Sequence, residues 1–341
     1  MKHHLCYLLL FFSISLAAQN SSSKNNFKIL CYNVENYFDC VDDSLTIDEE
    51  YLPDGMRRWN YTKYQAKQAN IAKVITAIGG WDAPAIVGLC EVESRKALTD
   101  LTRNSGLKNL NYEFVHFDSP DVRGIDVALL YQANQFKLIH EEAIGVFFPQ
   151  SPATKTRDIL LASGIVATGD TLHIFVCHFP SRLGGELESE DRRIRVASTL
   201  RGKVDSLFNI SASANIVIMG DFNDYPDNKS ITQVLKAEQP KDNPEVGNLY
   251  NLAYPLHLQG KGSHKYDGEW GMLDQFIVSG NLLNTSNQFY TTSADMHIFD
   301  ADFLLENDAT HLGKKPFRTY IGMKYNNGFS DHLPIYADFW Y

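Results

Sequence analysis

Asp221 and Asn223 are the residues whose types and position most clearly suggest chemistry. An apolar segment at 215–219 predicts a buried strand. After Gly220, the chain places three polar residues within four positions, namely Asp221, Asn223 and Asp224. Carboxylate and amide groups of this kind bind Mg²⁺ and orient a water molecule or a phosphoryl oxygen. The same residues also suit a strand followed by an Asx-rich turn, so this segment alone leaves both interpretations open.

Other polar residues stand at the same kind of junction, where an apolar strand-like segment meets a loop. They are Asn33, Glu91, His178, Asp331 and His332. Asp274 differs, because it lies inside its predicted strand at 273–279, where an unpaired carboxylate would be costly. A histidine is one partner that would offset this cost. Each residue alone has an ordinary structural explanation, but the repeated pattern favours one shared site.

The segments that carry these residues predict an α/β layered fold. Strand-like segments at 27–32 and 84–90 alternate with helix-like segments at 62–78 and 95–103, as in helices packed on sheets. A third, amphipathic helix is expected at about 189–208, directly before the strand at 215–219.

The first helix has clear sequence signals at both ends. Thr62 and Gln65 have the spacing of a capping box, which predicts that the helix begins at Thr62. Gly79 and Gly80 are expected to end it.

The middle of the chain is rich in short β-type segments, which we expect at 112–117, 127–131, 136–139, 159–168 and 171–179. Gly169 and Asp170 separate the last two segments and predict a β-hairpin. Residues 300–329 are punctuated by Gly and Asn and predict a long loop before a last strand at 333–340. Because no linker-like stretch divides residues 27–341, we expect one domain there.

The N-terminus has the features of an export signal. A weakly basic start precedes an apolar segment that is too short to anchor in a bilayer, and Ala17 and Ala18 supply a small-residue cleavage site. Cys6 lies too early in the chain to be a site of lipid attachment. We therefore expect a signal peptide at 1–18, a flexible leader at 19–26 and a secreted or periplasmic protein.

The formal net charge of −10 argues against broad, charge-driven binding to nucleic acid or anionic membranes, although it permits a local basic cleft.

Four cysteines lie after the expected signal peptide. Export would permit disulfides between them, but most of these cysteines lie in apolar segments, which favours free buried thiols. These cysteines are Cys31, Cys40, Cys90 and Cys177. No C-x-x-C motif or Cys/His cluster suggests zinc.

Residues 39–54 form an acidic segment with two interpretations. A solvated surface loop is favoured over a calcium site, because the segment lacks the spacing of an EF-hand loop.

Together, the polar residues and their flanking segments resemble the endonuclease/exonuclease/phosphatase (DNase I-like) superfamily of metal-dependent phosphohydrolases. The matching segments, in chain order, are Asn33-Val34, Leu89-Cys90-Glu91-Val92, His178, Gly220-Asp221-Phe222-Asn223-Asp224, Leu273-Asp274 and Ser330-Asp331-His332-Leu333-Pro334. The sequence motifs around Asn33 and His178 look most similar to those of secreted bacterial members of this superfamily. The resemblance implies a four-layer α/β-β/α sandwich of two mixed β-sheets flanked by helices, with the site where strand ends converge at one edge.

The resemblance also implies a metal centre. Glu91 would be the principal ligand of Mg²⁺, with Asn33 beside it and Asp331 completing the metal and water network. Mn²⁺ or Ca²⁺ could replace Mg²⁺.

The remaining roles concern water and phosphate. Asp221 would position or deprotonate the attacking water, Asn223 would hold a phosphoryl oxygen, and His178 would donate to the phosphate. Asp274 would hydrogen-bond His332 and favour its imidazolium form, so that His332 could stabilise the phosphoryl group or transfer a proton. Asp224 is expected to be a turn residue only.

The segment after His178 bears on the substrate. The abasic-site repair nucleases carry Tyr-x-x-Asn where this chain has His178-x-x-Ser181, which argues against a repair role. Ser181, Arg182 and the two glycines after Leu183 could contact a phosphate, or they could form a turn with a surface arginine.

The favoured function is a secreted, Mg²⁺-dependent nuclease or phosphodiesterase acting on nucleic acid. The alternative is a phosphatase or phosphodiesterase for phospholipid headgroups, inositol phosphates or other small phosphate esters. A non-catalytic binding module is disfavoured, because none of the catalytic residue types that the resemblance implies is missing.

Overall fold

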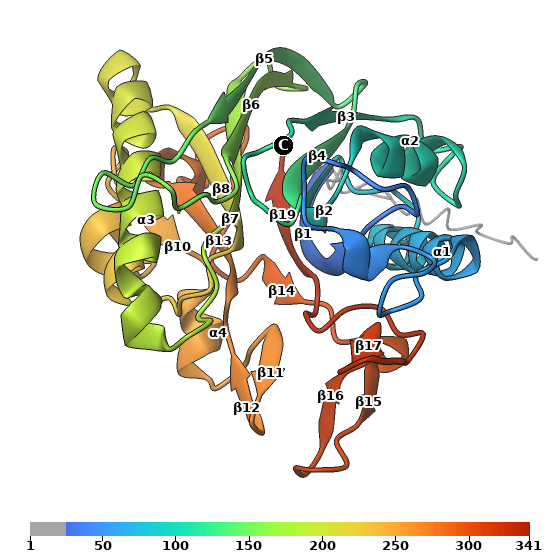
Figure 1. Cartoon of the computed structure of the whole chain (residues 1–341). Helices are drawn as coiled ribbons and strands as arrows, with labels where there is room; N and C mark the ends of the chain where they lie inside the picture. The colour runs from blue at the N-terminus through green and yellow to red at the C-terminus, as the bar shows by residue number, and fades with distance from the viewer. Residues whose placement is uncertain (1–24) are drawn as a thin grey trace, which may run out of the picture.

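Two mixed β-sheets lie face to face at the centre of the computed structural model, which describes residues 25–341 (Figure 1). The signal peptide expected at 1–18 and most of the leader lie outside the described residues. The last residue of the expected leader, Asn26, belongs to the first strand, because it pairs with Trp340 near the end of the chain.

The first sheet has six strands and contains, in spatial order, β14 (Met296–Ile298), β19 (Ile335–Trp340), β1 (Asn26–Tyr37), β2 (Ile86–Val92), β4 (Asp126–Gln132) and β3 (Tyr112–His116). The second has seven strands and contains, in spatial order, β5 (Phe136–Ile144), β6 (Ile159–Val166), β7 (Thr171–His178), β8 (Asn215–Asp221), β13 (Asp274–Ser279), β10 (Leu249–Asn251) and β9 (Ala237–Glu238). The parallel pairs β1–β2 and β7–β8 bring the carboxyl ends of four strands to one edge.

Helices cover the outer face of each sheet, as expected for the four-layer sandwich (Figure 1). The helices α1 (Tyr61–Gly79) and α2 (Arg95–Arg103) pack on the first sheet, and the long helix α3 (Glu186–Ile210) packs on the second. Shorter helical turns are α4 (Tyr254–Leu258), η1 (Glu49–Tyr51), η2 (Ser230–Leu235), η3 (Gly280–Leu283) and η4 (Asp302–Leu304). No helix in the described part of the chain is long and apolar enough to cross a bilayer.

The apolar core between the sheets explains their close approach. Cys31 of β1, Val176 of β7 and Met219 of β8 are fully buried there. A Cβ atom on Gly88 of β2 would lie 2.6 Å from the terminal methyl group of Met219, so a larger residue there would require the Met219 side chain to move.

Several predicted elements are confirmed, and their ends differ for local reasons. The hairpin between β6 and β7 turns at Gly169, which adopts φ +88° and donates its N–H to the carbonyl of Val166. The first helix begins at Tyr61 rather than Thr62, and its N-cap is Asn60, whose side chain accepts from the N–H of Lys63 at 3.1 Å. The capping box predicted from Thr62 was therefore wrong.

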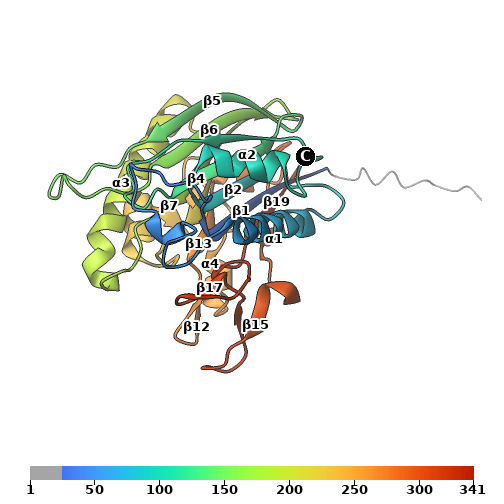
Figure 2. The ribbon, with the colours of Figure 1, turned by 45° about the vertical axis from the view of Figure 1, so that its right-hand side comes forward.

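The long loop predicted at 300–329 was also wrong, because that region folds into two β-hairpins. The first pairs β15 (Leu305–Asn307) with β16 (Lys314–Pro316), and the second pairs β17 (Tyr320–Ile321) with β18 (Lys324–Tyr325). A third hairpin pairs β11 (His264–Tyr266) with β12 (Glu269–Gly271). All three project from one edge of the sandwich (Figures 1 and 2).

The four cysteines of the described chain are free thiols, and Cys31, Cys90 and Cys177 are buried, as expected. The acidic segment 39–54 is less solvated than predicted, because Asp39 and Asp48 are buried. Their carboxylates accept hydrogen bonds from backbone N–H groups of the same segment.

Candidate active site

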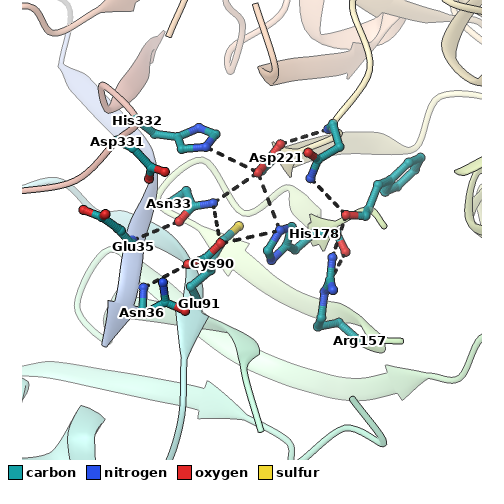
Figure 3. Close-up of polar contacts among 12 residues, drawn as sticks. Asn33, Glu35, Asn36, Cys90, Glu91, Arg157, His178, Asp221, Asp331 and His332 are labelled. Carbon is teal, nitrogen blue, oxygen red and sulfur yellow. Dashed lines mark hydrogen bonds and ion pairs between the residues drawn. The ribbon is translucent and has the colours of Figure 1, made fainter. Parts of the chain in front are cut away.

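The carboxyl-terminal parts of β1, β2, β7 and β8 meet at one edge of the sandwich and bring four of the predicted residues together (Figure 3). They are Asn33, Glu91, His178 and Asp221. Asn33 was expected just after its strand, but β1 continues to Tyr37 with an irregular register against β2. His332 joins these four residues from the segment that leads into β19, which an isolated β-bridge ties to His264 of β11. The structure thus assembles a cluster from distant parts of the chain.

Asp221 lies at the centre of this cluster. Its Oδ2 atom is 3.1 Å from Nδ2 of Asn33, 3.5 Å from Nε2 of His178 and 3.7 Å from Nε2 of His332. Its Oδ1 atom accepts a hydrogen bond from the N–H of Asn223 at 2.9 Å. Burial raises the pKa of Asp221 to about 7, and the nearby carboxylates act in the same direction.

His332 is held by Asp274, the first residue of β13. Its Nδ1 atom lies 2.7 Å from Oδ2 of Asp274, which also accepts a hydrogen bond from Oγ of Ser263 at 2.6 Å. Burial alone would lower the pKa of His332, but the carboxylates of Asp274 and Asp221 raise it well above its usual value. The imidazole is therefore poised to carry a positive charge at neutral pH.

Glu91 reaches the cluster from a strained backbone position. Its φ of 67° is rare for a residue with a side chain, and the pairing of β2 with β4 shifts register at this point. One carboxylate oxygen accepts from Nδ2 of Asn33 at 3.2 Å, and the other accepts from the N–H of Asn36 at 2.9 Å. The bulge thus turns the carboxylate of Glu91 toward β1.

Asn33 presents the nitrogen of its amide to the cluster. Its Oδ1 atom accepts from the N–H of Glu35 at 3.0 Å, while Nδ2 faces Glu91 and Asp221. A metal-ligand role would require the amide to be turned over, since only the oxygen can bind the ion. The ligand role of Asn33 stays a prediction.

His178 is positioned by a buried arginine. Nε and one terminal nitrogen of Arg157 donate to the carbonyls of His178 and Phe179 at 3.2 and 2.6 Å, and Arg157 pairs with Asp121 at 2.9 Å. Burial, with help from Arg157, holds the pKa of His178 well below its usual value. The imidazole of His178 is thus neutral, unlike that of His332.

Asn223 lies in the turn after β8, with φ 49°, and its contact with a phosphoryl oxygen stays a prediction. Its Nδ2 atom donates to the carbonyl of Phe179 at 3.1 Å. This contact ties the turn after β8 to the end of β7.

Ser181 and Arg182, the predicted phosphate contacts, differ in exposure and in hydrogen bonding. Ser181 is exposed. Arg182 donates from Nε to the carbonyl of Asn223 at 2.7 Å and uses its terminal nitrogens on Glu186 and Asn228 at 3.0 and 3.1 Å. In this arrangement the guanidinium holds the turn after β8, and a phosphate contact by either residue stays a prediction.

Asp224 has a larger role than the turn residue that was predicted. It is buried, and its carboxylate pairs with Arg193 of α3 at 2.6 Å and accepts from Oγ of Ser230 at 2.5 Å. The partner, Arg193, lies in an amphipathic helix whose sequence gives no sign of a buried arginine.

Asp331 is paired with Arg318, a residue that the sequence did not single out. The two groups are 2.9 Å apart, and Arg318 also contacts Glu35 at 3.0 Å. His264 is a further unpredicted neighbour, because its ring centroid lies 4.7 Å from that of His332.

The donor set suits a hard divalent cation. Ligand atoms of Asp221, Asp274 and His332 lie within 4.8 Å of one another, as do those of His264, Asp331 and His332, but a charged His332 has no lone pair for an ion, so the carboxylates would be the ligands. The carboxylates of Glu91, Asp221 and Asp331 add the oxygen donors that Mg²⁺ and Mn²⁺ prefer. The concentration of buried acidic groups, which raises the pKa of Asp221, would be relieved by a bound cation.

A fold of two packed mixed sheets, with carboxylates and imidazoles at the converging strand ends, defines a class of phosphoric ester hydrolases. Residues 28–339 match the sequence model of the Endonuclease/Exonuclease/phosphatase family, and the chain belongs to this family. No curated protein matches the chain.

Solved structures with different activities share the fold. The catalytic domain of human nocturnin with bound sulfate is 16% identical, with 94% of this chain and 98% of that chain covered and a TM-score of 0.54. D. rerio TDP2 complexed with single-strand DNA product is 15% identical, with 92% and 98% covered and a TM-score of 0.54. A mannosyl-6-phosphatase of Bacteroides thetaiotaomicron is 14% identical, with 92% and 99% covered and a TM-score of 0.54. At these identities the likeness shows the fold alone.

Proposed function

We propose that this chain is a divalent-metal-dependent phosphohydrolase in which Asp221 handles the attacking water and His332 the phosphoryl group. The observation that carries this proposal is the position of Asp221, whose Oδ2 atom faces two imidazoles that differ in charge. Hydrolysis of a phosphate ester needs an oriented nucleophile together with donors that neutralise the phosphoryl oxygens. The cluster supplies both around the carboxylate of Asp221.

Asp221 suits the task of orienting water and accepting its proton. Its carboxylate is buried beside Asn33, His178 and His332, where it can accept a proton from a bound water molecule. The N–H of Asn223 holds one carboxylate oxygen, so the other is aimed at the cluster.

His332 and His178 have different roles in the proposed reaction. His332, charged through its contact with Asp274, places a cation where the negative phosphoryl group would lie. His178 is neutral and directs Nε2 toward Asp221 and Glu91, at 3.5 and 3.9 Å, so it can donate a hydrogen bond there. Arg157 holds the backbone of His178 through the carbonyl.

Glu91 would hold the divalent ion, with Asp331 and Asn33 as further oxygen donors. When bound, the ion supplies charge neutralisation for the phosphoryl oxygens and acidifies a water molecule. Mg²⁺ fits the oxygen-rich donors best, and Mn²⁺ is the alternative.

The charges around the cluster favour a small phosphate ester as the substrate. Binding of a polynucleotide relies on cations that are free to meet successive phosphates. Here Arg157 pairs with Asp121, Arg182 with Glu186, and Arg318 with Glu35 and Asp331. The net charge of −10 acts in the same direction.

A nuclease or phosphodiesterase acting on nucleic acid is the second candidate. It is supported by the complete set of motifs together with the export signal predicted at 1–18. Phospholipid headgroups belong with the small esters, because they present the same phosphate chemistry.

A substrate panel tests these proposals. The protein is incubated with Mg²⁺ or Mn²⁺ and with sugar phosphates, inositol phosphates, phospholipid headgroup esters, and single- and double-stranded DNA and RNA. We expect release of phosphate or phosphorylated product from small esters, and none from the Asp221→Ala variant. Cleavage of nucleic acid alone would establish the second candidate, and a lack of hydrolysis with either metal would refute the phosphohydrolase proposal.

A further inference from the structure

A further group of side chains that could hold a metal ion lies at the turn between β3 and β4. His116 is the last residue of β3, Asp126 is the first residue of β4, and Asp118 lies in the segment between them. One ligand atom from each of these residues lies within 4.8 Å of the others. Figure 1 shows β3 and β4 side by side at the outer part of the first sheet.

His116 is the unusual member of this group. Its side chain is only 1% exposed, yet its Nε2 atom makes no hydrogen bond with any described residue. A buried imidazole normally satisfies its ring nitrogens with hydrogen-bonding partners or a metal ion. The nitrogen is aimed at Asp126, whose Oδ2 atom is 3.5 Å away.

The two carboxylates face different nitrogens of this imidazole, so Asp118 would have to turn toward the Nε2 side to share an ion with Asp126. Oδ1 of Asp126 accepts from the N–H of Ser119 at 3.0 Å, which fixes the carboxylate and leaves Oδ2 facing His116. Oδ1 of Asp118 lies 3.8 Å from Nδ1 of His116. The side chain of Asp118 is 92% exposed and can swing toward the ring at little cost.

We propose that His116, Asp118 and Asp126 bind a late first-row divalent ion, for which Zn²⁺ is the best fit. Ligands about 2.0–2.1 Å from a tetrahedral ion lie roughly 3.4 Å apart, close to the distance between His116 and Asp126. An imidazole with two carboxylates suits Zn²⁺, whereas Mg²⁺ prefers an all-oxygen set. A water molecule would complete the tetrahedron.

The ion would act on the candidate active site by closing a loop. Its ligands stand at both ends of the segment 117–125, which contains Asp121, the partner of Arg157. Arg157 in turn holds the carbonyl of His178. The same segment accepts a hydrogen bond at Val122 from the N–H of Ile47. The ion would therefore fix the segment 117–125, which supports His178 through Asp121 and Arg157.

Metal binding is tested in a background that weakens the catalytic centre, so that the two sites are separated. The Glu91→Gln protein is stripped with chelator and titrated with Zn²⁺ by calorimetry. We expect one tight Zn²⁺ site per chain in this variant and loss of that tight site when His116→Gln is added. X-ray absorption of the loaded protein should show an imidazole ligand that His116→Gln removes.

Asp118→Asn supplies a variant whose fold is not at risk, because the side chain is exposed. Added to Glu91→Gln, it should weaken Zn²⁺ binding at least tenfold and remove the rise in Tm that Zn²⁺ produces. Asp82→Asn, at another exposed aspartate, should change neither quantity. Unchanged Zn²⁺ affinity in Asp118→Asn, or no Zn²⁺ binding by Glu91→Gln itself, would overturn the proposal.

Discussion

Nδ1 of His332 lies 2.7 Å from Oδ2 of Asp274, and both side chains are buried. Asp274 opens β13, which pairs with β8 so that Asp274 stands directly opposite Asp221. The imidazole of His332 therefore lies between Asp274, which orients it, and Asp221, with which it can form an ion pair. This geometry makes Asp274 a positioning residue for His332.

Replacement of Asp274 by asparagine should reduce kcat about 10²–10⁴-fold, because the amide keeps the shape but loses the charge that favours the imidazolium. NMR titration of His332 should show a lower pKa in Asp274→Asn than in the wild type, because the carboxylate raises it. Ser263→Ala, which removes only the hydroxyl contact to Asp274, should cost about tenfold or less. Equal activity in Asp274→Asn and wild type would contradict the positioning role.

Removal of the central groups should abolish turnover while leaving the fold intact. Asp221→Ala and His332→Ala are each expected to lower kcat/KM by about 10³-fold or more, since water activation and phosphoryl stabilisation are lost. Circular dichroism and Tm check the fold. His297→Ala, a histidine of β14 whose ring lies against Tyr336, is the matched control and should retain activity. Near-normal turnover in either central variant would show that the roles are misassigned.

Glu91→Gln should weaken the dependence on metal rather than simply lower activity. The variant is expected to need at least tenfold more Mg²⁺ for half-maximal rate, because a charged oxygen ligand becomes a neutral one. Glu93→Gln is the control, since Glu93 accepts a hydrogen bond from the N–H of Asp39 and does not contact the cluster. A metal titration of both variants on the same substrate decides the matter, and identical curves would contradict the ligand role of Glu91.

A variant of Arg182 can distinguish a role in positioning the turn after β8 from direct contact with the phosphate. Because Arg182 holds the carbonyl of Asn223, Arg182→Met should lower kcat about tenfold and lower Tm, with little change in KM. Arg192→Met, which removes a half-buried arginine that donates to the carbonyl of Leu183, should change neither. A large rise in KM with unchanged Tm would instead support the phosphate contact predicted from the sequence.

The buried Lys67 should make the free energy of unfolding depend on pH. Burial lowers its pKa to about 8, whereas the ordinary value is 10.5. Between these values the unfolded chain binds more protons than the folded chain, so the stability contributed by Lys67 rises with pH. The gain is about 1.4 kcal/mol per pH unit in this window.

The measurement compares urea unfolding of wild type and Lys67→Met from about pH 8 to about pH 10. The stability of the wild type relative to the variant should increase with pH. At neutral pH the variant should be less stable than the wild type, because the hydroxyl of Thr319 and the carbonyl of Phe329 lose their donor. A difference that stays constant with pH would contradict the lowered pKa.

The pattern of strand ends was visible in the sequence because a strand is apolar until it leaves the core. The polar residue that follows marks the edge of the sheet, which is how Asn33, Glu91, His178 and Asp221 could be placed together. The histidine partner of Asp274 could be foreseen for a related reason, since a carboxylate inside a strand needs a counterpart.

The residues that support the cluster could not be foreseen from local pattern. Arg157 and Arg193 are buried, and each pairs with an aspartate far away in the chain. Charged residues usually lie at the surface, so no sequence signal marks the exceptions. The hairpins within 300–329 were missed because their strands are only two or three residues long.

The left-handed backbone at Glu91 was equally invisible. Glutamate has no preference for φ of 67°, and only the register shift of β2 against β4 produces it. Such strain arises from the surrounding sheet and not from the residue itself.

The hydroxyl of Ser330 donates to the carbonyl of Asn33, which lies 297 residues earlier in the chain. The same neighbourhood joins the first strand of the sheet to the last, β1 to β19. A ribosome-bound chain that ends before these residues already carries Glu91, His178 and Asp221 but has neither His332 nor the strand that closes the sheet. Contacts of such long sequence separation slow folding, because loop closure costs entropy before they form. A chain released before Ser330 would lack His332 and the closing strand, and we expect it to be inactive.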